Sequence, residues 1–190
     1  LKMRIPGIGA EVINQLGGTA VNMPPGEIMP ALQQGVIDAT EWVGPWVDKI
    51  SGLHKIANYY YGPGIHEPGT ANELIMSAEK WNSLPNNLKE IIKIACHSIY
   101  IESLSEFLYY NSLSLEELKK KYNVKVLSFN SEIMKKMFEI SSSVIIEFSN
   151  LGEIHKEIYN SWHNSLKKYN NYQKFSDYGY IKERINSLKI

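Results

Sequence analysis

Hydrophobic and polar positions divide the chain into two stretches with different periodicities. Within residues 1–80, short apolar runs alternate with segments whose apolar residues recur at helical spacing, and Gly and Pro separate them. The pattern predicts strands at residues 2–5, 19–23 and 36–40 and helices at residues 8–16 and 27–34. Strands that alternate with helices are typical of βαβ crossovers, so this stretch indicates an α/β fold with a parallel sheet.

The second stretch, after residue 80, is mainly helical. Branched and aromatic residues at the end of the first stretch predict two more strands, at residues 56–61 and 70–77, and apolar residues then recur at helical spacing over residues 86–122. A helix of that length spans about 55 Å and could bridge two lobes as a shared spine. Poor helix formers at residues 111–114 leave open that it breaks there. The remaining pattern predicts a strand at residues 124–129 and helices at residues 132–148, 152–169 and 172–190.

Composition excludes several classes of protein. The 190 residues include 20 basic and 20 acidic side chains, and this zero formal charge argues against a nucleic-acid-binding surface. No apolar run reaches the roughly 18 residues that a membrane span requires. The single cysteine, Cys96, excludes an intrachain disulfide, and its place on an apolar helix face predicts a core residue. No initiator Met or signal peptide precedes the first strand, so we expect a fragment that lacks its N-terminal part.

Three charged side chains stand beside turn signals. Glu41 precedes a Gly-Pro pair, Glu67 precedes a Pro-Gly pair, and Arg4 comes shortly before Pro6. Glu41 also follows the predicted strand at residues 36–40, and ligands of open parallel sheets bind outside the carboxyl ends of strands. One cation and two anions at element ends suit a site that holds a small carboxylate through Arg and a hard metal ion through Glu. Three exposed charges near turns are the alternative.

Neighbouring aromatic and histidine residues carry a weaker signal. His66 adjoins Glu67, but no Cys or second His lies near it, so we expect a hydrogen-bonded structural residue. Trp46 is expected either to line a cleft or to pack against the protein. Side chains alternate along a strand, so either Tyr60 or its two tyrosine neighbours can face a ligand.

Four blocks of sequence carry a family resemblance: residues 2–7 (KMRIPG), 16–21 (LGGTAV), 27–42 (EIMPALQQGVIDATEW) and 60–69 (YYGPGIHEPG). They resemble the solute-binding subunits of tripartite ATP-independent periplasmic (TRAP) transporters. The pairs Glu41-Trp42 and His66-Glu67 are similar to the metal-assisted branch of that family, which binds 2-oxo acids and lactate.

The resemblance implies a two-lobed, periplasmic-binding-protein-like α/β receptor with a long bridging helix, whose cleft closes on an organic acid. Arg4 would bind the acid's carboxylate, because a guanidinium pairs both carboxylate oxygens and keeps its charge. The carboxylates of Glu41 and Glu67 and the main-chain carbonyl of Trp42 would hold a metal ion that also contacts the acid. An all-oxygen set of ligands suits Ca²⁺ or Na⁺. Further ligands would come from the N-terminal part of the family's proteins, which we expect this chain to lack.

The same resemblance implies an organisation and partners. Residues 1–69 would form the ligand- and metal-binding part of lobe II, residues 70–106 a return strand and the first part of the long helix in lobe I, and residues 107–171 the rest of lobe II. Residues 172–190 would form a C-terminal helix that carries the contact of a homodimer, and a helix that folds back on its own lobe is the alternative. The protein would be periplasmic and would deliver its acid to the TRAP membrane permease subunits.

Two rival classes remain. In an enzyme acting on an oxo acid, Glu41 and Glu67 would be an acid–base pair and Arg4 the anchor of the substrate. In a structural or assembly module, the long helix would be the functional element and no ligand would change the stability. The sequence leaves open which acid is bound and whether the ion is Na⁺ or Ca²⁺.

Overall fold

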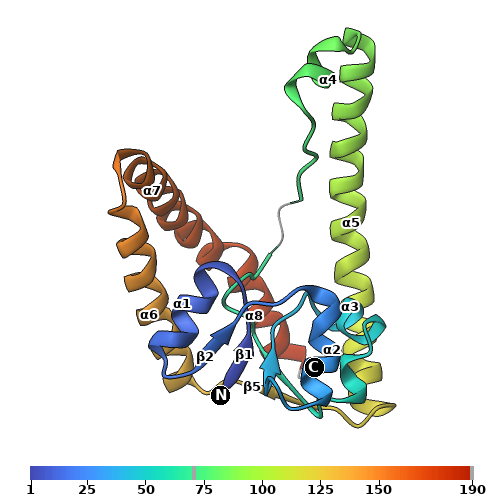
Figure 1. The fold of residues 1–190 in the computed structure, drawn as a ribbon, viewed down its shortest axis with the longest axis vertical. Coiled ribbons are helices and arrows are strands. Elements are labelled where there is room, and N and C mark those ends of the chain that lie inside the picture. The colour runs from blue at the N-terminus through green and yellow to red at the C-terminus, as the bar shows by residue number, and fades with distance from the viewer. Residues whose placement is uncertain (70–71, 189–190) are drawn as a thin grey trace. The chain divides into compact units, whose positions relative to one another are not determined.

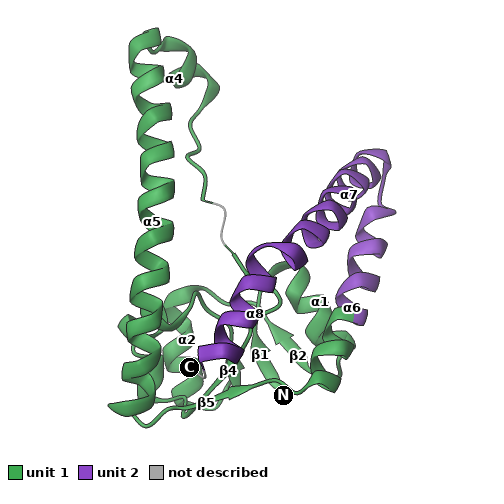
Figure 2. Cartoon of the chain, turned by 180° about the vertical axis from the view of Figure 1, so that it is seen from behind, with its two compact units in different colours: residues 1–138 green, residues 139–190 purple. Residues whose placement is uncertain are grey.

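The computed structural model describes residues 1–69 and 72–188 (Figure 1). The chain forms two compact units, residues 1–138 and residues 139–190 (Figure 2). The predicted assignment of residues 1–69, 70–106, 107–171 and 172–190 to two lobes stays a prediction. None of the helices in the described residues has the length and hydropathy of a membrane-spanning segment.

The first unit begins with the predicted parallel α/β segment. Its elements are β1 (Lys2–Arg4), α1 (Gly7–Gln15), β2 (Thr19–Val21), α2 (Pro25–Gln33) and β3 (Ala39–Thr40). The strands form one sheet in the order β2-β1-β3, and both pairs are parallel (Figure 1). The predicted α/β class with a parallel sheet is therefore confirmed, and β1 lies at the centre of the sheet.

Local sequence signals explain where these elements end. Pro6 lacks the amide hydrogen that a ladder needs, so it stops β1 and stands at the start of α1. Strand β3 is shorter than predicted, because the amides of Val36 and Ile37 bond to the carbonyl oxygen of Ala31 and extend the end of α2 instead. Ile28, Ala31 and Ile37 are buried together and form the core beside the sheet.

A second, two-stranded parallel sheet joins distant parts of the first unit. Strand β4 (Tyr59–Gly62) pairs with β5 (Lys125–Ser128). Strand β5 lies within the range predicted from sequence, whereas β4 starts later than predicted and ends one residue beyond residue 61. The helix α3 (Pro45–Ile50) and the short 3-10 turn η1 (Leu53–Lys55) precede β4 and were not predicted. The signal for α3 was present, because Pro45 directly after Gly44 is a proline at the first helical position, where proline is favoured.

The predicted strand at residues 70–77 is wrong where it can be checked. Residues 72–77 carry no strand, and residues 70 and 71 lie outside the described residues. Leu74 and Ile75 are exposed, so the branched side chains that suggested a strand do not pack on a partner strand here. The following residues form α4 (Ala78–Ser83), which the sequence reading missed although Ser77 caps it by accepting a hydrogen bond from the Lys80 amide at 3.2 Å.

The predicted long helix is continuous. Helix α5 runs from Asn86 to Lys120 without a break at residues 111–114, where the sequence leaves a break open. Tertiary contacts override the weak local propensity there: Ser114 is buried, and the Asn111 side chain binds the start of α3. Cys96 lies on this helix but is exposed, so its predicted place in the core is wrong.

The last helices follow the predicted order with shifted boundaries. Helix α6 (Ser131–Ser149) ends in the second unit, which also contains α7 (Glu153–Phe175) and α8 (Asp177–Leu188). Helix α7 continues six residues beyond the predicted end at residue 169, and the final helix starts at Asp177 instead of residue 172. Residues 189 and 190 of that predicted helix lie outside the described residues.

Candidate functional site

The order of the strands brings Arg4 and Glu41 together. The chain leaves β1 toward β2 on one side and returns to β3 on the other side, so the direction of the connections reverses between β1 and β3. The crevice at such a switch point, outside the carboxyl ends of the strands, is where open α/β sheets bind ligands. Arg4 is the last residue of β1 and pairs with Thr40, and Glu41 follows at once. The Glu41 amide donates to the Arg4 carbonyl oxygen at 3.2 Å, which fixes the two residues side by side.

The side chains of these two residues form a buried ion pair. Nη1 of Arg4 contacts Oε1 of Glu41, and Arg4 Nε donates to the Met23 carbonyl oxygen at 3.4 Å. The guanidinium also lies over the ring of Trp42, with Cζ 5.4 Å from the ring centroid, which is a favourable cation–π geometry. Arg4 is therefore held from three sides at the end of β1. The alternative of scattered surface charges is wrong for Arg4 and Glu41, because their side chains are almost completely shielded from solvent.

His66 contacts the other oxygen of the same carboxylate. Its Nε2 atom lies 3.4 Å from Oε2 of Glu41, and the pair becomes an ion pair when the imidazole is protonated. The sequence predicted a structural role for His66 but not this partner. Glu41 therefore has one oxygen beside Arg4 and the other beside His66.

A pocket opens at this point of the first unit. It has a volume of about 170 Å³ and is lined by six residues: Arg4, Pro6, Glu41, Trp42, Val43 and Glu67. All four residues predicted from sequence for the site, Arg4, Glu41, Trp42 and Glu67, are in that lining. The volume is several times the ~30 Å³ of one liquid water and below the ~300 Å³ at which pockets for drug-sized ligands begin. The pocket therefore suits a small organic molecule.

The lining of the pocket supplies oxygen ligands for a metal ion, but only a few. Among residues 1–69 and 72–188, no group of three or more His, Cys, Asp or Glu side chains could hold a metal ion. The two carboxylates of the pocket and a main-chain carbonyl are the ligand type that Ca²⁺ and Na⁺ take, whereas Ca²⁺ requires six to eight oxygens. The residues present fit such an ion in kind, and the bound acid or other residues would have to complete the set.

Asp48, which the sequence reading did not single out, organises the loop after Glu41. This carboxylate lies in the first turn of α3 and is only 6% exposed. Its Oδ1 atom accepts hydrogen bonds from the amides of Val43 and Gly44, at 3.1 and 3.0 Å, and its Oδ2 atom accepts from the Tyr60 hydroxyl at 2.7 Å. Acidic residues in first helical turns are common, so only the tertiary structure distinguishes this one.

Burial governs the electrostatics of Asp48 and Tyr60. Desolvation raises the pKa of Asp48 above its ordinary value, although hydrogen bonds from Gly44, Tyr60 and Val43 oppose the shift. Desolvation and the adjacent Asp48 carboxylate likewise raise the pKa of the Tyr60 phenol, so this hydroxyl keeps its proton and acts as a donor.

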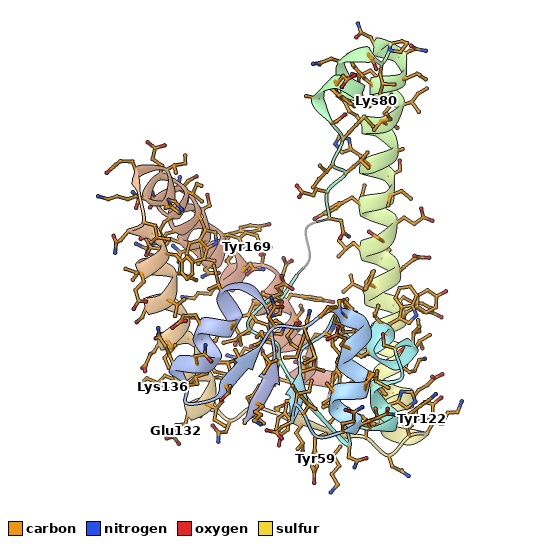
Figure 3. The ribbon with its side chains drawn as sticks, in the orientation of Figure 1. Tyr59, Lys80, Tyr122, Glu132, Lys136 and Tyr169 are labelled. Carbon is orange, nitrogen blue, oxygen red and sulfur yellow. The ribbon has the colours of Figure 1, made fainter. Side chains whose placement is uncertain are left out.

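The remaining aromatic candidates pack within the first unit. Trp46 stacks on Tyr110 of α5 at 4.6 Å between ring centroids, which confirms the packing alternative over a place in the pocket lining. Tyr60 is half-buried and bonded to Asp48, whereas Tyr59 is exposed beneath Lys125, as the predicted alternation requires. Tyr59 and Tyr122 are labelled in Figure 3, and the ring of Tyr122 lies 4.2 Å from that of His54.

A second pocket, of about 290 Å³, contains none of the predicted site residues. Its lining is mostly apolar and consists of Leu74, Met76, Trp81, Ile92, Lys93, Cys96 and His97. No paired charges of the kind that would recognise a carboxylate occur in this lining, so the pocket at the end of β1 is the better candidate site.

Comparison with known proteins identifies relatives over most of the chain. The model of the family described as bacterial extracellular solute-binding protein, family 7, matches residues 1–151. A monocarboxylate 2-oxoacid-binding periplasmic protein of Nostoc sp. strain PCC 7120 is 37% identical over 164 residues, which are 85% of this chain and 44% of that protein.

Solved structures of TRAP periplasmic solute-binding proteins share the fold. The protein from Colwellia psychrerythraea, with bound calcium and pyruvate, is 36% identical with a TM-score of 0.86 over 96% of this chain and 56% of that one. The protein from Pseudoalteromonas atlantica T6c, with bound sodium and pyruvate, is 32% identical with a TM-score of 0.85 over 96% of this chain and 55% of that one. The protein from Bordetella bronchiseptica RB50, a mixed-occupancy dimer with calcium and picolinate, is 30% identical with a TM-score of 0.90 over 100% of this chain and 56% of that one.

These matches confirm the predicted fold class. The chain spans about half the length of the relatives and structures that it matches.

Proposed function

The chain belongs to family 7 of the bacterial extracellular solute-binding proteins, and from this premise we propose that it carries the ligand-binding part of a periplasmic receptor for a small monocarboxylate. The ligand class is a 2-oxo or 2-hydroxy acid, bound together with a Ca²⁺ or Na⁺ ion. The receptor delivers this acid to the membrane permease subunits of a TRAP transporter.

One observation carries the proposal. A buried guanidinium and two carboxylates line a single small pocket at the switch point of the sheet. Arg4 matches the charge and the planar geometry of a carboxylate. Glu41, Glu67 and the main-chain carbonyl of Trp42 match a hard cation. A metal ion held by these oxygens would supply positive charge to the bound acid, and the relatives that hold pyruvate with calcium or sodium support this assignment.

The proposed receptor is not an enzyme. The family is one of solute-binding proteins, and Glu41 is engaged by Arg4 and His66 rather than being held as a free base. An acid–base pair would turn over the oxo acid, whereas a receptor returns it unchanged.

Calorimetry on the full-length protein tests this function directly. Pyruvate should bind in buffer that contains Ca²⁺ or Na⁺, and NMR of the acid recovered after hours of incubation should show pyruvate alone. If pyruvate, lactate and longer 2-oxo acids all fail to bind, both in Ca²⁺ buffer and in Na⁺ buffer, the proposed receptor function is refuted. A new product signal would favour the enzyme, and an unchanged melting temperature with every acid would favour a structural module.

We also propose that the full-length protein is a homodimer with α8 at the interface. Helix α8 and the end of α7 expose large apolar side chains, namely Tyr172, Phe175, Tyr178, Tyr180, Ile181, Ile185 and Leu188. Exposed apolar side chains that lie close together mark a surface that a partner covers. Isologous dimers are the commonest assemblies, so we propose a second copy as that partner. Light scattering should report a dimer for the intact protein and a monomer for a chain that ends at Asn171. A monomeric mass of the intact protein at micromolar concentration would refute the dimer.

A further inference from the structure

We propose that Asp48 is a positioning residue that aims the main-chain carbonyl of Trp42 at the cation of the site. The inference rests on the proposed function, because it concerns the same pocket. It assigns a role to a buried carboxylate that neither the pocket lining nor the family resemblance includes.

The planarity of the peptide group provides the first step. The carbonyl of Trp42 and the amide of Val43 belong to one peptide unit, and in a trans unit these two groups point in opposite directions. The only cis peptide bond among the described residues is Gly62-Pro63, so the Trp42-Val43 unit is trans. Because Oδ1 of Asp48 accepts from the Val43 amide at 3.1 Å, it sets the direction of the Trp42 carbonyl on the other side of that unit.

The second step is that Asp48 is itself fixed. The same Oδ1 atom accepts from the Gly44 amide, and the Asp48 amide donates to the Gly44 carbonyl oxygen at 2.8 Å. Oδ2 accepts from the hydroxyl of Tyr60, which lies on β4 and pairs with Val126 of β5. A carboxylate has enough lone pairs for three such bonds. Asp48 therefore ties the loop after Glu41 to α3 and to the second sheet.

The third step is that the loop after Glu41 requires the hydrogen bonds to Asp48 to keep one conformation. Trp42 and Val43 line the pocket, and the loop enters α3 through Gly44. The φ of Gly44 is 154°, a conformation that glycine adopts readily and other residues rarely do. A short loop with such a residue has several conformations of similar energy unless other groups select one. An oxygen ligand that is held in place avoids the ordering cost of binding, which is the benefit of preorganisation.

A set of variants in the full-length protein tests the role. Asp48→Ala removes all three hydrogen bonds, whereas Asp48→Asn keeps an acceptor oxygen for the two amides and an amino group for Tyr60. Asp38→Asn is the matched control, since Asp38 also accepts from a backbone amide, that of Lys2 at 2.7 Å, but at the amino end of the sheet. Calorimetry with pyruvate and Ca²⁺ should show at least a tenfold weaker affinity for Asp48→Ala and a change below threefold for Asp48→Asn and Asp38→Asn.

Hydrogen exchange without ligand gives a second readout. The amides of Val43 and Gly44 should exchange at least tenfold faster in Asp48→Ala than in the wild type, and at the wild-type rate in Asp38→Asn. Where Asp48→Ala fails to fold, Tyr60→Phe replaces it, because removal of one hydroxyl loosens Asp48 without removing its bonds to the loop. A two- to fivefold loss of affinity is expected for that variant.

The outcomes separate this inference from the proposed function. A wild type that binds neither pyruvate nor Ca²⁺ would refute the function and the role at its cation site together. A wild type that binds, beside a folded Asp48→Ala with the same affinity or with unchanged exchange at Val43 and Gly44, would overturn the inference alone. Equal affinity of Tyr60→Phe and wild type would overturn it where Asp48→Ala does not fold.

Discussion

Arg4 and Glu41 neutralise each other at the ends of adjacent parallel strands, with only 9% and 8% of their side chains exposed. If an acid bound Arg4 alone, the buried Glu41 carboxylate would lose its ion-pair partner. If a cation bound Glu41 alone, Arg4 would lose its partner. Breaking a buried pair from one side costs about 3–5 kcal/mol. When both ligands bind, each charge exchanges one partner for another, so we expect acid and cation to bind cooperatively.

The first prediction concerns this coupling. Calorimetric affinity for pyruvate should rise with Ca²⁺ concentration, and the coupling free energy should be about 1–3 kcal/mol, or roughly 5- to 150-fold. A chelator should abolish the gain, and the affinity for Ca²⁺ should rise by the same factor when pyruvate is present, because linkage is reciprocal. Pyruvate that binds metal-free protein as tightly as metal-loaded protein would contradict the prediction.

The second prediction concerns the geometry of Arg4. Arg4→Lys keeps the positive charge but loses the planar fork that pairs both carboxylate oxygens, so the affinity for pyruvate should fall by about 2–5 kcal/mol. Arg184→Lys is the control, because Arg184 is exposed beside Tyr180 on α8. An Arg4→Lys protein with wild-type affinity would remove Arg4 from the site.

The third prediction separates binding from stability at Glu67. This residue is exposed, so Glu67→Gln should change the free energy of unfolding of the ligand-free protein by less than about 0.5 kcal/mol. The same variant should lose affinity for Ca²⁺ and pyruvate together, since the ion joins them. Glu73→Gln, also exposed, serves as the control and should bind normally. Unchanged Ca²⁺ affinity in Glu67→Gln would exclude Glu67 as a ligand.

The fourth prediction follows from the raised pKa of Asp48. A carboxyl whose folded-state pKa exceeds its unfolded value binds a proton more tightly in the folded state, so its contribution to stability is present at low pH and is lost as pH rises through the folded pKa. Asp48→Asn does not titrate. Its free energy of unfolding relative to the wild type should therefore increase as pH rises from about 3 through the folded pKa. Denaturant titrations of both proteins across that range measure the difference, and a difference that is constant with pH would show that Asp48 has no shifted pKa.

The fifth prediction concerns Gly44. Its φ of 154° and ψ of 172° are nearly exclusive to glycine, and a Cβ there would lie 3.2 Å from Oδ1 of Asn111, which accepts from the Trp46 amide. Gly44→Ala should destabilise the protein by about 1–3 kcal/mol. Gly26 is the control, since a Cβ there meets no atom within 4 Å in the first turn of α2. Gly26→Ala should stabilise by about 0.4–1 kcal/mol, and chemical denaturation of the two variants should show opposite signs.

Local signals in the sequence were sufficient to place the charged residues at the ends of elements. Periodicity and the stops at Pro6 and Gly35 determine β1, α1, β2 and α2, and hence put Arg4 and Glu41 just where strands end. The absence of a proline after Pro85 allows one continuous helix, α5. The ends of these strands and helices depend on residues a few positions apart, so the sequence by itself determines them, whereas the continuity of α5 over residues 111–114 also depends on tertiary contacts.

Other features depend on contacts between distant residues, and only the tertiary structure decided them. The order β2-β1-β3 pairs Arg4 with Thr40 across 36 positions and so makes a site of two separate charges. The strand predicted at residues 70–77 failed over residues 72–77, because branched residues form a strand only where a partner strand lies beside them. Asp48 looks like any acidic residue in a first helical turn until Tyr60 and the Val43 amide are brought to it. Such hydrogen bonds and burial join residues that are distant in sequence, so the spacing of hydrophobic and polar residues along the chain cannot predict them.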